Sequence, residues 1–356
     1  MRERLRIVVP GLALVLAVVL LAGCDNTGQT GGEGQQNGQQ SEEETQSMQL
    51  GTVEQWARST HARPVTFAAE EEGCKNCHDG LTFSETGGGF QPRFEPEEAT
   101  GSAEATGTEE EPQERDWVVA TDCRACHMAR GAEIADAGSV GGVPNLDEVQ
   151  AGLGSLCIAC HNGWHPPGEQ DGELRAPHSS VQADMLYGVN TLPVEGAEST
   201  GTASEEASQS PHAKVDDTCV GCHVNAPSEE DGPNHTFAIT SYEGCQQEGC
   251  HEEDMTEGGT AQEDYDGDGQ TESVQAEVEG LLENLQDAVN RAAGSSEFQS
   301  EGGQVVFTGG GNRSGDDPVY HAAYNYFFVV DDSSMGIHNT QFTVQLLQDS
   351  ISAVSE

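Results

Sequence analysis

Five short segments of the chain carry two cysteines and a histidine that directly follows the second cysteine. Two thiols a few residues apart can add to the two vinyl groups of one porphyrin, and the adjacent imidazole can then bind its iron. The pattern therefore predicts five haem c groups, each with one proximal histidine. The sites, numbered in chain order, are site 1 (Cys74, Cys77, His78), site 2 (Cys123, Cys126, His127), site 3 (Cys157, Cys160, His161), site 4 (Cys219, Cys222, His223) and site 5 (Cys245, Cys250, His251).

Three other uses of paired cysteines compete with this interpretation. Zinc sites do not require a histidine at a fixed position after each pair, and a thioredoxin-like redox motif would occur once rather than five times. Disulfides suit an exported protein but do not predict the trailing histidine. Site 5 has four residues between its cysteines rather than two, so its attachment rests on the weakest of the five patterns.

Seven of the twelve histidines lie outside the motifs and are candidates for the opposite face of each iron. Residues 160–163, 176–180 and 182–186, together with the ending 323–339, resemble segments of bis-histidine multihaem c-type cytochromes. That resemblance implies distal ligation by the histidines in Pro-His and Gly-x-His-Asn contexts. The candidates it supports are His178 and His338, with His212 and His235 in similar contexts and His61 as the remaining one, whereas His165 and His321 are left out.

Two imidazoles on every iron would leave no coordination position for a substrate, which favours electron transfer at low potential over catalysis. An enzyme is the first alternative, because pentahaem cytochromes of the ammonia-forming nitrite reductase type share the haem count and a similar Gly-x-His-Asn ending. In that family a lysine usually replaces the motif histidine at the catalytic haem, whereas all five motifs here end in histidine. The second alternative is a cytochrome filament or other homo-oligomer, in which His61 ligates a neighbouring chain's haem.

Acidic residues dominate the charge of the chain. It has 62 Asp and Glu against 14 Lys and Arg, a formal net charge of −48. This excess excludes nucleic acid as a partner and favours redox partner proteins with basic docking surfaces. It also suggests a protein adapted to high salt, although acidic solvated loops would account for part of the excess.

The N-terminus has the features of an export signal. Three arginines precede an apolar run, and residues 21–24 resemble a bacterial lipobox, which implies cleavage of residues 1–23 and lipidation of Cys24. The alternative is an uncleaved membrane helix, for which the run is short. Residues 24–50 would form a flexible tether, so we expect a lipoprotein anchored to the membrane and facing the periplasm or the cell surface, with no indication of which membrane.

The fold expected from the sequence is mostly irregular and α-helical, with long acidic loops, little β-structure and haems as the core. Only 35% of the residues are apolar, and 28 to 62 residues separate successive motif histidines, too few for an independent domain around each site. Residues 51–256 would bind the haems, and residues 257–356 would form a helical region. Apolar spacing predicts a helix over 272–293 and a second pattern over 319–330, with Asn339 capping the last helix and loops at 94–114 and 195–210.

An acidic hexapeptide stands before the first of these helices. Asp264, Asp266 and Asp268 match the opening of a calcium-binding loop, but position twelve would be Gln275 rather than the glutamate that an EF-hand requires. Glu272 or Glu277 could replace that glutamate. The alternative is an acidic turn that caps the helix.

Overall fold

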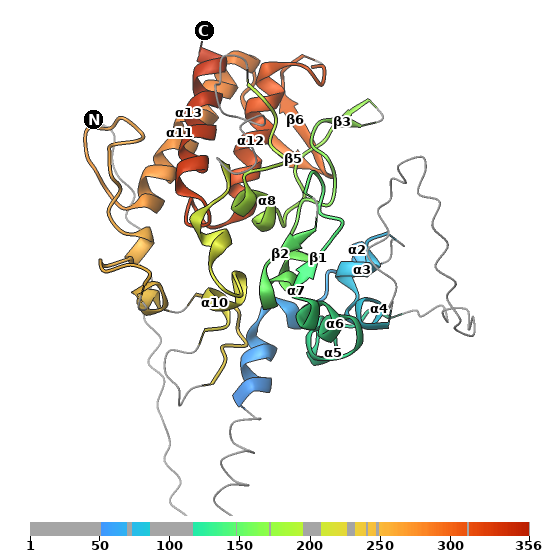
Figure 1. Ribbon diagram of the computed structural model, residues 1–356. Coiled ribbons are helices and arrows are strands. Elements are labelled where there is room, and N and C mark those ends of the chain that lie inside the picture. The colour runs from blue at the N-terminus through green and yellow to red at the C-terminus, as the bar shows by residue number, and fades with distance from the viewer. Residues whose placement is uncertain are drawn as a thin grey trace, which may run out of the picture. The chain divides into compact units, whose positions relative to one another are not determined.

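Three helices near the C-terminus form the largest apolar core of the protein (Figure 1). They are α11 (Val274–Ala293), α12 (Pro318–Asp332) and α13 (Thr340–Ser355), and each packs against the other two. Their buried side chains recur three or four residues apart, which places them on one face of each helix. The predicted 272–293 helix is confirmed to within two residues of its start.

Local capping interactions explain where these helices begin and end. The Ser273 side chain accepts a hydrogen bond from the Ala276 N–H at the start of α11. The Asn339 side chain accepts one from the Phe342 N–H (3.4 Å) at the start of α13, so the predicted cap is confirmed. The amide of Asn339 also donates to the carbonyls of Met185 (3.1 Å) and Ser208 (2.8 Å), which ties α13 to the middle of the chain.

The computed structural model describes residues 51–355 except 70–72, 86–116, 147, 171, 195–207, 226–231, 240, 247–248 and 312. The predicted signal, Cys24, the tether and the 94–114 loop lie outside the described residues, as does most of the 195–210 loop. None of the described helices is long and apolar enough to cross a membrane.

The cysteine motifs lie on or beside short helices in the region before α11, where a second apolar cluster includes Ile158, Ala159 and Tyr187. Residues 51–58 are also helical. The short helices are η1 (Thr60–Ala62), α2 (Thr66–Ala69), α3 (Lys75–His78), α4 (Gly80–Glu85), α5 (Cys123–His127), α6 (Ala129–Ala137), η2 (Gly152–Gly154), α7 (Ser155–Ile158), α8 (Gln182–Tyr187), η3 (Pro211–Lys214), α10 (Cys219–His223), η4 (Tyr242–Gln246) and η5 (Thr256–Gly258).

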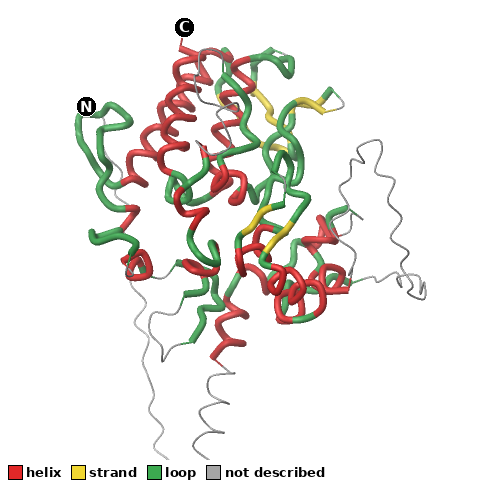
Figure 2. The backbone as a smooth tube through the Cα atoms, viewed as in Figure 1, coloured by secondary structure: helices red, strands yellow, loops and turns green. Residues whose placement is uncertain are grey.

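The strands of the described residues are few and form three two-stranded antiparallel sheets (Figure 2). The pairs are β1 (Ser139–Val140) with β2 (Val149–Gln150), β3 (Glu169–Gln170) with β4 (Glu173–Leu174), and β5 (Glu297–Glu301) with β6 (Gln304–Thr308). Gly302 and Gly303 connect β5 to β6 with φ of 59° and 78°, a backbone that favours glycine in tight hairpins. A mostly helical and irregular fold with little β-structure is therefore confirmed.

Candidate metal centres

In a cysteine motif, about one turn of helix brings the two cysteines and the histidine close together. At site 1 the His78 N–H donates to the Cys74 carbonyl (2.9 Å), and at site 3 the His161 N–H donates to the Cys157 carbonyl (2.8 Å). This bond between residues four apart brings the histidine back beneath its first cysteine. At sites 2 and 4 the whole motif is helical, within α5 and α10.

Site 5 closes in the same way despite its longer loop. The His251 N–H donates to the Cys245 carbonyl (3.0 Å), the bond that sites 1 and 3 make between residues only four apart. The longer spacing therefore still brings the histidine back to its first cysteine. This backbone geometry supports including site 5 with the other four.

Each motif histidine lies opposite one of the five expected distal histidines. The ring centres are separated by 6.1 Å in His78–His178, 6.3 Å in His127–His235, 6.0 Å in His61–His161, 6.2 Å in His223–His338 and 6.1 Å in His212–His251. Metal–nitrogen bonds of about 2 Å on both sides of one ion would put two imidazole centres roughly 6 Å apart. The five pairs therefore fit a metal held between two histidines.

The hydrogen bonds of six of the ten paired rings leave the same nitrogen available. In each of them Nδ1 has a protein partner, so Nε2 is the atom left to face a metal. The partners are Gln182 Oε1 for His161 (3.1 Å), Ser180 Oγ for His178 (2.7 Å), the Ile337 carbonyl for His212 (3.1 Å), the Phe237 carbonyl for His223 (2.9 Å), the Pro233 carbonyl for His235 (2.9 Å) and Asp332 Oδ1 for His338 (2.7 Å).

Burial keeps several of these imidazoles in the neutral form that binds metals. Loss of solvation, reinforced by a neighbouring histidine, lowers the pKa of His61 and that of His178 to about 4. Desolvation also lowers the pKa of His161. At His338 desolvation acts in the same direction, but the Asp332 carboxylate outweighs it and raises the pKa.

The two histidines left out of the ligand set lie in different surroundings. Both ring nitrogens of His321 have backbone partners, the Pro193 carbonyl at 2.6 Å and the Gly315 carbonyl at 2.7 Å, so neither is available to a metal. The ring of His165 lies 4.4 Å from that of Trp164. Neither His321 nor His165 faces a motif histidine among the described ring contacts.

Sites far apart in the sequence come together through their thiols. The thiols of Cys77 (site 1) and Cys160 (site 3) lie close enough to shift each other's pKa, and the Cys77 sulfur is 3.7 Å from the Ala159 carbonyl oxygen. Cys157 of site 3 has the same relation to Cys219 of site 4. None of the ten motif cysteines forms a disulfide.

Phe237 connects three sites. Its ring lies 4.7 Å from that of His61, in the site 3 pair, and 6.0 Å from that of His235, in the site 2 pair. Its carbonyl accepts the hydrogen bond from His223 of site 4. Together with the proximity of Cys77 to Cys160, these contacts place site 3 next to sites 1, 2 and 4.

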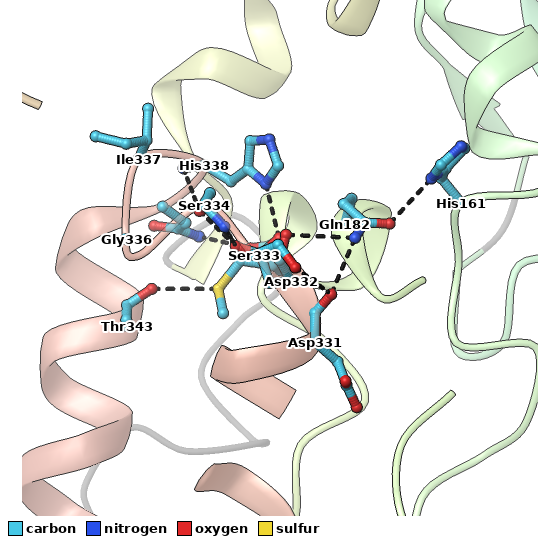
Figure 3. A network of polar contacts seen from close by, with 12 residues as sticks. His161, Gln182, Asp331, Asp332, Ser333, Ser334, Gly336, Ile337, His338 and Thr343 are labelled. Atoms are coloured by element: carbon cyan, nitrogen blue, oxygen red, sulfur yellow. Dashed lines mark hydrogen bonds and ion pairs between the residues drawn. The ribbon is translucent and has the colours of Figure 1, made fainter. Parts of the chain in front are cut away.

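A polar network joins sites 3 and 4 at the end of α12 (Figure 3). Gln182 contacts His161 through its carbonyl oxygen, and its amide donates to the backbone carbonyls of Asp331 (3.1 Å) and Asp332 (3.3 Å). The Asp332 carboxylate then accepts the hydrogen bond from His338. Site 5 is next to site 4, because His212 bonds to the carbonyl of Ile337, the residue before His338.

The acidic loop before α11 gathers its three aspartates. Single carboxylate oxygens of Asp264, Asp266 and Asp268 lie within 4.8 Å of one another. Glu277, which could have replaced the missing EF-hand glutamate, is buried and accepts hydrogen bonds from the N–H groups of Tyr265 (2.7 Å), Asp266 (3.2 Å) and Glu272 (2.9 Å). Its carboxylate therefore holds the loop against α11.

Three residues that organise these sites were not identified from the sequence. Gln182, Asp332 and Phe237 act through other side chains, and no motif marks such residues. The only local signal was their position inside the segments that resemble bis-histidine cytochromes or next to a candidate distal histidine.

Comparison with known proteins identifies no relative of this chain. No family model matches the chain, and neither the curated proteins nor the solved structures contain a match.

Proposed function

We propose that this chain is an electron-transfer protein that binds five haem c groups, each attached to one cysteine motif and ligated by one histidine pair. The observation that carries the proposal is the pairing itself. Five motif histidines meet five histidines from elsewhere in the chain, all with ring centres 6.0–6.3 Å apart. When bound, haem iron between two imidazoles supplies a one-electron couple without an open coordination position.

The pairing favours this role over a nitrite reductase-like enzyme. Such an enzyme needs one iron with a free position for substrate, whereas a second imidazole faces every motif histidine here. It also weighs against a filament held together by His61, because His61 already faces His161 of the same chain.

The contacts between sites suggest a route for the electrons. Thiol contacts join site 1 to site 3 and site 3 to site 4. Phe237 joins site 2 to site 3, and the His212–Ile337 bond joins site 5 to site 4. The proposed order is 1–3–4–5 with site 2 branching from site 3, so electrons would enter or leave at sites 1, 2 and 5.

The surroundings of this route suggest its biological setting. A lipid on Cys24 would keep the protein at a membrane of the cell envelope, facing the periplasm or the cell surface. The net charge of −48 favours donor and acceptor proteins with basic docking surfaces. We therefore propose a role in anaerobic or extracellular respiration.

Mass spectrometry of the intact protein, combined with a pyridine haemochrome assay, tests the proposal. Protein from cells that mature c-type cytochromes should have the mass of the polypeptide from Cys24 onward, with its lipid, plus five haem groups. Its ferric spectrum should be low-spin throughout, because each iron would have two strong imidazole ligands. A colourless protein, with cysteines that are free or joined as disulfides, would contradict it.

Calcium binding at Asp264, Asp266 and Asp268 is a separate proposal. The Asp268 N–H lowers the pKa of Asp266, but desolvation and the neighbouring acids together outweigh it and raise that pKa, so a cation at this cluster would be favoured. We expect calorimetric titration with Ca²⁺ to show one weak site, because Glu277 is engaged elsewhere. The Asp264→Asn/Asp268→Asn variant should abolish the heat, and the absence of heat in the unaltered protein would refute the site.

A further inference from the structure

His338, the proposed distal histidine of site 4, differs from the other paired histidines in what its Nδ1 contacts. Among the paired histidines, five of the six described Nδ1 partners are neutral: one amide, one hydroxyl and three backbone carbonyls. The sixth is the carboxylate of Asp332, whose Oδ1 lies 2.7 Å from Nδ1 of His338. The Asp332 side chain is fully buried, so solvent does not weaken this interaction.

The turn after α12 holds the carboxylate in place. The Ser334 hydroxyl and N–H both donate to Asp332 Oδ2, and the same hydroxyl accepts from the His338 N–H (3.1 Å). Ser333, Met335 and Gly336 have positive φ (62°, 50° and 89°), which turns the chain so that His338 lies back over the end of α12 (Figure 3). The negative end of the α12 dipole lies at the same place.

We infer that Asp332 is a positioning residue for His338 that gives its imidazole partial anionic character and makes site 4 the lowest-potential site of the five. The inference rests on the proposed function. A carboxylate that accepts the outer N–H of a metal-bound histidine fixes the ring and increases its basicity. A more basic ligand stabilises ferric over ferrous iron, which lowers the reduction potential.

Redox titration of Asp332→Asn tests the inference in the protein carrying all its haems. We expect five haems still attached, one component moved to higher potential, and the other four nearly unchanged. The expected change in the ferric/ferrous equilibrium of that component is at least tenfold, about 59 mV for one electron. The component that moves should be the lowest in the unaltered protein.

Asp331→Asn is the matched control. It removes the same charge one position earlier, and the Asp331 carboxylate points away from His338 in Figure 3. Equal shifts in both variants would show a general charge effect and overturn the inference. So would an unchanged titration of Asp332→Asn, or movement of a component that is not the lowest.

Ser334→Ala provides a second test should Asp332→Asn fail to fold. Loss of the hydroxyl that holds Asp332 Oδ2 loosens the carboxylate against His338, so the same component should move to higher potential, by less than in Asp332→Asn. No shift, or a shift of another component, would overturn the inference. If the unaltered protein contained no haem, the proposed function would fail instead, and mass spectrometry would show that before any titration.

Discussion

Replacing both Cys157 and Cys160 by serine is expected to remove the proposed haem of site 3 and, with it, the fold around the cysteine motifs. The two residues flank Ile158 and Ala159, which are 1% and 3% exposed in the second apolar cluster. Their thiols also lie close enough to those of Cys219 in site 4 and Cys77 in site 1 to shift one another's pKa. Loss of a group larger than any side chain at this centre should cost roughly 5 kcal/mol or more of unfolding free energy, by extension from large-to-small core substitutions.

The matched control removes a peripheral site by the same chemistry. Cys250 is exposed, and the described contacts of site 5 reach only site 4, so Cys245→Ser/Cys250→Ser should leave a folded protein with four haems. Haem content, intact mass and resistance to limited proteolysis compare the two variants. Equal tolerance of both losses would contradict a central position for site 3.

The sequence predicted which histidines are candidate ligands, but not which of them face each other. The motif histidines follow from local spacing, and the resemblance supplied the candidates for the opposite positions. The pairing itself, such as His61 with His161 or His127 with His235, joins residues about a hundred positions apart. Long-range pairs of this kind depend on how the short helices pack, and neither periodicity nor local spacing encodes that.

Helices and their ends were predictable for a different reason. In α11 and α13 the apolar spacing and the caps at Ser273 and Asn339 lie within the elements themselves. Asp332 shows where this reasoning stops. In the sequence it is one acidic residue among 62, and only the turn that folds His338 back onto α12 distinguishes it from a solvated carboxylate.

Removing a distal histidine should open one iron to exogenous ligands. His178→Gly deletes the imidazole that faces His78 at 6.1 Å, while the site 1 motif stays intact. We expect five haems still attached, one of them high-spin and able to bind carbon monoxide when reduced, because it retains a single histidine ligand. Electron paramagnetic resonance and difference spectra after carbon monoxide addition measure both effects.

His165→Ala is the matched control because the ring of His165 lies close to the same site and His165 is not in the proposed ligand set. Its ring is 4.4 Å from that of Trp164, which in turn lies 6.3 Å from the ring of His178. Loss of His165 should therefore leave all haems low-spin and unreactive towards carbon monoxide. If His165→Ala gave the high-spin signal and His178→Gly did not, the ligand of site 1 would be His165, and the assignment of imidazole pairs from ring separations would be wrong at that site.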